Sequence, residues 1–241
     1  MLGIGVLLLL LFISSIPAII VFFWFRLGRY PFTFSRFAVS LLAGATSFFL
    51  ALFLQKLVAG ERIFTVIMGK WGLLAEIFVR TALTEELSRL VMLLVLFLLT
   101  RRFVTGSSGD GGEAASINAG TQGSAFALAS ASGLIAGFGF AILESAVYGA
   151  SNPGNAILRV FTATPLHGAC GSNVGISLLM FPQNPVRAVF RFFIAVVIHG
   201  VYNFMMIIPG RMPPIAAVLI ALSALASSIV AIRGAMMENI R

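Results

Sequence analysis

Long apolar stretches dominate this sequence of 241 residues and restrict the folds open to it. A helix of about twenty apolar residues crosses the hydrocarbon core of a bilayer, where only helices and closed barrels satisfy every backbone hydrogen bond. Counting such stretches, and ending them at charges or Gly/Pro clusters, gives about seven spans. The expected bounds are 2–25, 37–58, 72–100, 123–149, 157–181, 188–208 and 213–233. We therefore predict an all-α polytopic membrane bundle that forms one integral membrane domain over residues 1–241.

Composition excludes an ordinary soluble domain, because 59% of the residues are hydrophobic and only 10% are charged. The net charge of +8 is also no sign of a nucleic-acid partner, since the 16 Lys and Arg residues are scattered between apolar runs. We interpret them as topology signals. The predicted surroundings are the lipid bilayer.

Two regions depart from the pattern of simple spans. The first is 62–80, where an amphipathic interfacial helix leading into a span near 81–100 is an alternative. It carries four charged residues among apolar ones: Arg62, Lys70, Glu76 and Arg80. The second is 104–122, whose Gly/Ser-rich composition predicts a flexible cytoplasmic loop.

The distribution of basic residues predicts an orientation. Arginines are more frequent after the first and third spans, at the start of the sixth and at the end of the chain than in the alternate loops. The positive-inside rule then places the N-terminus outside and the C-terminus in the cytoplasm. The stretch 2–25 lacks a basic leader and a cleavage pattern, so we interpret it as a span and not as a signal peptide.

Several ionisable side chains interrupt the predicted spans. Such a group at the bilayer centre costs roughly 2.5 to 3.5 kcal/mol, so a set of them implies mutual pairing, a wet cavity, or both. They are Glu85, Glu86, Arg89, Glu144, His167 and His199. We predict that they form an active or conducting site in the outer half of the bilayer.

Helical spacing groups these residues further. Arg89 follows Glu86 by three residues and Glu85 by four, so it reaches either carboxylate along one face. A salt bridge that only packs helices would account for one glutamate and leave the second unpaired. Separately, Phe140 and Glu144 are four residues apart and share a stripe.

The two histidines and the single cysteine admit structural explanations as well. His199 and Asn203 are four residues apart, and a histidine there could simply bind a neighbouring carbonyl. His167 lies in TPLHGACGS, where proline and glycines favour a kinked or closely packed helix. Cys170 has no evident base or thiolate-favouring neighbour, which argues against a catalytic thiol. Likewise, Glu144 alone could be a protonated packing residue.

The ordered motifs resemble those of the PrsW family of intramembrane proteases, within the larger grouping of CAAX prenyl endopeptidases and bacteriocin-processing-type proteases. The matching elements, between residue 84 and about 204, are EExxR from Glu85 to Arg89, FxxxE ending at Glu144, His167, and HxxxN from His199 to Asn203. CAAX-type members are instead described with EExxxR and FxxxH, so the differences favour the PrsW branch. They also weaken the transfer of the CAAX mechanism, in particular to Glu144.

The resemblance implies an intramembrane endopeptidase that cuts a membrane-anchored protein near the extracytoplasmic face, in regulatory proteolysis of an anti-sigma-factor kind. Peptide hydrolysis needs an activated water, an oxyanion donor and a proton for the leaving amine. The resemblance points to Glu85 or Glu86 as the base. We expect His199 and Asn203 to stabilise the oxyanion, and His167 to orient water or protonate the amine.

Two mechanisms stay open at this stage. His167, His199 and a glutamate, with Glu144 as the expected carboxylate, would make a His₂Glu zinc site, although HExxH is absent. The PrsW family is often described as metalloprotease-like, whereas the CAAX relatives resemble glutamate proteases that require no metal. Metal analysis with chelator inhibition separates the two.

Two other classes of function compete with the protease. The seven-span scaffold subunit of γ-secretase resembles the same superfamily, so a non-catalytic assembly partner is an alternative, against which the paired Glu85 and Glu86 argue. A proton-coupled transporter ranks third, because no inverted repeat is detectable. The compact chain suits a bacterial inner membrane.

Overall fold

The computed structural model describes residues 4–28, 30, 32–58, 70–105 and 119–237. Within these ranges the chain folds into helices and no strand is present. The seven long helices are α1 (Ile4–Leu27), α2 (Phe34–Val58), α5 (Thr84–Thr105), α6 (Ala119–Ser151), α7 (Pro153–Met180), α8 (Pro185–Ile207) and α9 (Met212–Met237). The predicted all-α bundle is confirmed.

The third predicted span is longer and less regular than expected. Short α4 (Lys70–Ala75) and the π-helix η1 (Glu76–Leu83) lead without a break into α5. Residues 62–69 of the proposed interfacial helix lie outside the described residues. π segments within α-helices often occur at functional sites, and this one ends at Leu83, two residues before Glu85.

The predicted loop 104–122 falls mostly on 106–118, outside the described residues. Its first two residues belong to the end of α5, and its last four belong to the start of α6.

The outer surface of the bundle suits lipid. In the part of the chain that the structure describes, five helices are long and apolar enough to cross a membrane, namely α1, α2, most of α6, α8 and α9. Large apolar side chains are exposed along them, among them Phe12, Phe53, Phe190 and Leu219. Contiguous exposed apolar surface of this kind marks contact with a membrane or a partner. The protein is an integral membrane protein.

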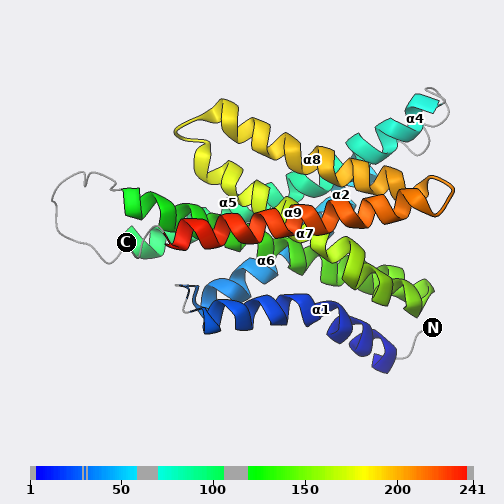
Figure 1. Cartoon of the computed structure of the whole chain (residues 1–241), viewed down its shortest axis with the longest axis horizontal. Coiled ribbons are helices and arrows are strands. Elements are labelled where there is room, and N and C mark those ends of the chain that lie inside the picture. The colour runs from blue at the N-terminus through cyan, green and yellow to red at the C-terminus, as the bar shows by residue number, and fades with distance from the viewer. Residues whose placement is uncertain (1–3, 29, 31, 59–69, 106–118, 238–241) are drawn as a thin grey trace.

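Helix α7 is more polar than the five apolar helices and is surrounded by other helices of the bundle. It packs against α1, α5, α6, α8 and α9, as its central position in Figure 1 shows. Polar side chains in a membrane protein are tolerated where they face other helices and find partners there. The enclosure therefore explains how α7 carries His167 within an apolar bundle.

The interface of α6 and α7 is close because glycines face backbone. A Cβ added at Gly137 would lie 1.9 Å from the carbonyl oxygen of His167, and one at Gly133 would lie 2.0 Å from that of Gly171. No side chain fits at either distance. The two helix backbones therefore approach closely at these glycines, and this contact holds the His167 turn against α6.

The two helices that carry the histidines begin at clear signals. The side chain of Asn152 accepts a hydrogen bond from the backbone N–H of Gly154 at the start of α7, and Asn184 accepts one from Arg187 at the start of α8. A proline follows each cap at the first helical position, where its missing N–H costs nothing. Each helix start is therefore fixed by local sequence.

The junctions place the polar residues toward one end of the bundle. In Figure 1 the α6–α7 and α8–α9 junctions lie at the same end, and the α1–α2 and α7–α8 junctions lie at the other. Glu144 precedes the end of α6 by about two turns, and His199 precedes the end of α8 by about two turns. Both residues therefore lie inside the bundle, about two helical turns from the same end.

Candidate active site

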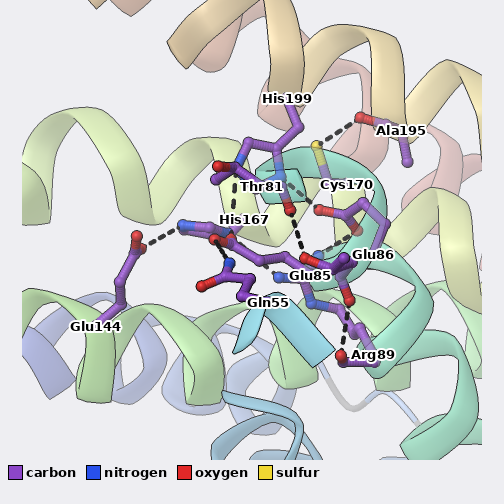
Figure 2. A network of polar contacts seen from close by, with 12 residues as sticks. Gln55, Thr81, Glu85, Glu86, Arg89, Glu144, His167, Cys170, Ala195 and His199 are labelled. Atoms are coloured by element: carbon purple, nitrogen blue, oxygen red, sulfur yellow. Dashed lines mark hydrogen bonds and ion pairs between the residues drawn. The ribbon is translucent and has the colours of Figure 1, made fainter. Parts of the chain in front are cut away.

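Acids and imidazoles from α5, α6, α7 and α8 converge in one buried cluster, shown in Figure 2. Its inner members are each at most 5% exposed: Glu85, Glu86, Arg89, His167 and His199. The expected meeting of side chains from four separate helices is therefore present. Such burial demands that charges be paired and hydrogen-bonded.

Glu86 is the acid whose two oxygens are both engaged. Arg89, one turn along α5, pairs with its Oε2. Nδ1 of His199 lies 2.8 Å from its Oε1. Because a carboxylate beside a guanidinium accepts hydrogen bonds, Nδ1 of His199 is the donor. Glu86 thereby fixes the ring orientation of His199.

Arg89 also reaches His167. Its Nη2 lies 3.2 Å from Nδ1 of His167. A guanidinium can only donate, so Nδ1 accepts and the ring hydrogen is assigned to Nε2 from the hydrogen-bond network. That Nε2 lies 2.6 Å from Oε2 of Glu144, which accepts its hydrogen bond. The His167 ring is thus held at both nitrogens.

Phe140 supports this arrangement from α6. Its ring centroid lies 4.9 Å from that of His167, and Cζ of Arg89 lies 4.9 Å from the Phe140 centroid. A guanidinium over an aromatic face gains a cation–π attraction that is larger away from water. The aromatic residue of the FxxxE motif therefore forms one wall of the cluster.

Glu85 is held differently from Glu86. Gln55 of α2 donates a hydrogen bond of 3.1 Å from Nε2 to Oε1 of Glu85. The second oxygen, Oε2, is buried without a hydrogen-bond partner and lies 3.5 Å from Nε2 of His199. Since Nδ1 of His199 carries the ring hydrogen, two acceptor atoms face one another unless the ring is doubly protonated. A cation between them would satisfy both.

A group of residues nearer the end of α6 surrounds Glu144. Nη2 of Arg159 lies 2.5 Å from Oε2 of Glu144, the same oxygen that accepts from His167. Cζ of Arg159 lies 4.2 Å from the ring centroid of Tyr148. The cluster thus extends from fully buried Glu86 to half-exposed Tyr148.

Not every residue singled out from the sequence joins the network. Asn203 is partly buried one turn after His199, and among the described residues no hydrogen bond links it to the cluster. Cys170 is buried and donates through sulfur to the backbone oxygen of Ala195, at 3.4 Å. That contact agrees with a structural role for the thiol.

Two residues of the site were not predicted from the sequence. Gln55 gave a weak signal as an amide near the end of an apolar span, and Arg159 was counted only as a topology charge. Their partners Glu85 and Glu144 are on other helices, so helical spacing does not relate either residue to its partner.

The described residues include one group suited to a metal ion. Ligand atoms of Glu85, His167 and His199 all lie within 4.8 Å of one another. Glu144, the carboxylate expected from the sequence, instead contacts the His167 ring at Nε2. A carboxylate that orients a ligating histidine is a common companion of metal sites. The geometry thus favours Glu85 as the carboxylate ligand.

Fold and site together define a polytopic helical membrane protein with a buried Glu/His centre suited to hydrolysis. The sequence model of the PrsW family intramembrane metalloproteases matches residues 34–231. The chain belongs to this family, and the expected resemblance is confirmed. Family membership implies an intramembrane protease with a protein substrate. Comparison with curated proteins gives no match, and comparison with solved structures gives none either.

Proposed function

We propose that this protein is a metal-dependent endopeptidase that hydrolyses a peptide bond of a membrane-anchored protein at the Glu85/His167/His199 centre. The observation that carries the proposal is the 3.5 Å separation between Oε2 of Glu85 and Nε2 of His199, two buried acceptor atoms directed at one another. Oε2 has no hydrogen-bond donor, and Nε2 is an acceptor as long as the His199 ring carries its single hydrogen at Nδ1. A divalent cation bound between them would satisfy both.

The residue types fit zinc, and so does the spacing of one pair, Glu85 and His199. Two ligand atoms about 2.1 Å from a tetrahedral ion lie roughly 3.4 Å apart, close to the observed separation. Two histidines and one glutamate are a known set for catalytic zinc, with a fourth position left for water. When bound, zinc supplies Lewis acidity that activates water at neutral pH.

The surrounding residues have distinct proposed tasks. Glu86 holds the His199 ring through Nδ1, and Glu144 holds the His167 ring through Nε2. Arg89 compensates the charge of Glu86, and Gln55 fixes Oε1 of Glu85 so that Oε2 points to the centre. Each of these contacts orients a donor atom before substrate binds, which is how preorganised sites avoid reorganisation cost.

Asn203 is a proposed oxyanion donor. Its amide lies on α8 one turn beyond His199 and is partly buried. An amide N–H₂ can stabilise negative charge that develops only in the transition state. Replacing Asn203 by Ala is expected to lower kcat more than it raises KM, which steady-state kinetics measures.

A mechanism without metal is the second candidate, and one contact favours it. Arg89 donates to Nδ1 of His167 while Glu144 accepts from Nε2, so both His167 nitrogens are engaged. Glu85, whose Oε2 is unsatisfied, would then be the general base. In this scheme Arg89 and a doubly protonated His199 stabilise the developing negative charge.

Metal analysis distinguishes the two mechanisms. We expect about one bound zinc per chain by elemental analysis, loss of cleavage with chelator and recovery with added zinc. The assay uses purified protein and a single-span reporter with a cleavable segment near the membrane surface. Full cleavage by metal-free protein in the presence of chelator would overturn the metal proposal and support Glu85 as the base.

Point variants test the centre itself. Glu86→Ala and His199→Ala are expected to abolish cleavage while the protein stays in the membrane fraction. Cys170→Ala is the matched control, because this buried neighbour bonds only the backbone of Ala195 among its described contacts. Retained cleavage in both site variants would remove these roles.

The cellular setting is part of the proposal. Basic loop residues support an N-terminus outside and a C-terminus in the cytoplasm. That orientation puts the end of the bundle nearest Glu144 at the outer leaflet, so cleavage would occur near the extracytoplasmic face of a bacterial inner membrane. Regulatory release of a signalling factor from a membrane-anchored protein is the proposed outcome.

A further inference from the structure

The site has a second arginine that the motifs do not include. Arg159 lies in the second turn of α7, and its Nη2 lies 2.5 Å from Oε2 of Glu144 on α6. The same oxygen accepts from Nε2 of His167 at 2.6 Å. Glu144 therefore connects Arg159 to a histidine of the buried centre through a single atom.

Arg159 is itself held in place. Its Cζ lies 4.2 Å from the ring centroid of Tyr148, one turn after Glu144 on α6. Stacking on an aromatic face and binding a carboxylate at the same time suits a planar guanidinium and does not suit an ammonium. The Arg159 side chain is 21% exposed, whereas Glu144 is 13% exposed, so the arginine lies on the outer side of the glutamate.

Glu144 needs a partner on its outer side to stay directed inward. A carboxylate this close to the end of α6 could turn toward the polar surface, where water would bind it. Arg159 opposes that rotation with an ion pair that closes over the carboxylate. The His167 ring then keeps an acceptor at Nε2, and its Nδ1 lone pair stays directed toward the centre of the cluster.

We propose that Arg159 is a positioning residue that holds Glu144 against Nε2 of His167 and so fixes the tautomer and orientation of that ring. Tyr148 supports Arg159 in this role. The effect on cleavage rests on the proposed function, whereas the effect on the His167 ring does not. Arg159 acts through Glu144 and does not touch the reacting atoms.

The chain has only two histidines, which makes the tautomer directly measurable. The experiment records ¹⁵N NMR of the imidazoles in histidine-labelled full-length protein in lipid nanodiscs. In the native protein we expect His167 as the Nε2–H tautomer. In Arg159→Met we expect its two ring signals to move toward a mixture of tautomers, while the His199 signals stay unchanged because Glu86 still holds Nδ1.

A matched control distinguishes the positioning effect of Arg159 from the general effect of removing an arginine. Nη1 of Arg191 on α8 binds Asn173 at 3.2 Å, outside the cluster, so Arg191→Met should leave both imidazoles unchanged. Arg159→Lys retains charge but not the planar fork, and we expect a shift smaller than that of Arg159→Met. If Arg159→Met fails to fold, the lysine variant carries the test, and unchanged His167 signals in it would overturn the proposal.

Cleavage and metal affinity complete the test. Removing a residue that orients a ligating histidine typically lowers metal affinity or activity by roughly 10–100-fold, and we expect a loss in this range for Arg159→Met. Unchanged His167 signals with unchanged or reduced cleavage would overturn the positioning role. Changed His167 signals with full cleavage would support positioning and remove His167 from the proposed function.

Discussion

Oε2 of Glu85 and Nε2 of His199 face each other 3.5 Å apart, and both accept hydrogen bonds when the single ring hydrogen is at Nδ1. The opposing ring nitrogen is occupied by Glu86, so the ring cannot turn to relieve the contact without breaking that bond. A buried acceptor without a donor costs about 1–3 kcal/mol. The site therefore carries local instability at the point where its proposed chemistry occurs.

Replacing Glu85 by Gln is expected to stabilise the protein while abolishing cleavage. The new amide N–H₂ can donate to Nε2 of His199, and the amide oxygen can still accept from Gln55. We expect a gain of about 0.5–1.5 kcal/mol, measured by thermal unfolding in detergent. Glu76→Gln is the control, because its ion pair with Arg80 is about one-third exposed and should change stability by less than about 1 kcal/mol. A destabilised, active Glu85→Gln protein would contradict this account.

Gln55 is expected to matter for cleavage although it belongs to no motif. In Gln55→Leu the carboxylate of Glu85 loses its donor at Oε1 and can rotate away from His199. We expect a decrease in kcat/KM of roughly 10–100-fold, comparable to other residues that orient a functional group. Gln183→Leu, in the exposed turn after α7, provides the comparison and should cleave normally. Equal rates for both variants would show that Glu85 needs no support from α2.

The Glu86–Arg89 pair should show strong coupling. Arg89→Met leaves a buried carboxylate uncompensated, which typically costs about 3–5 kcal/mol of stability. Adding Glu86→Gln removes that charge, so the double variant should be more stable than Arg89→Met alone. A double-mutant cycle on thermal unfolding measures the coupling. Additive effects would mean that the two side chains act independently.

Gly137 is expected to tolerate no side chain. A methyl group there would meet the His167 backbone oxygen at 1.9 Å, and the two helices would have to separate. We expect Gly137→Ala to lower stability by about 1–3 kcal/mol or more, and to reduce cleavage because His167 moves away from Glu144. Gly234→Ala on α9 is the control, since nothing lies within 4 Å of the added atom. Thermal unfolding and reporter cleavage test both variants.

Much of the fold could be predicted from local sequence. Apolar length and turn residues predicted the long helices, because a membrane-spanning segment must satisfy its backbone within itself. The polar positions predicted a site for the same reason, since Glu85, Glu86 and His199 would be costly if left unpaired in lipid. Helical spacing predicted that Arg89 meets Glu85 or Glu86, and the structure shows that the partner is Glu86.

Other parts of the site had no local signature. Gln55 and Arg159 reach partners on different helices, at sequence separations that no helical period relates. The choice of Glu85 over Glu144 beside the two histidines depends on how α5 and α6 are rotated about their axes. Those rotations are set by packing contacts such as Gly137 against His167.

The sequence by itself determined that this chain is a helical membrane protein and which ionisable residues it keeps away from lipid, because both follow from transfer energies of single segments. The tertiary structure decided which atoms meet. Glu86 binds Nδ1 of His199, Glu144 binds Nε2 of His167, and Glu85 faces Nε2 of His199. The physical reason is that hydrogen bonds and ion pairs are effective only over a few ångströms. Distances that short are fixed by the packing of whole helices and not by the spacing of residues along any one of them.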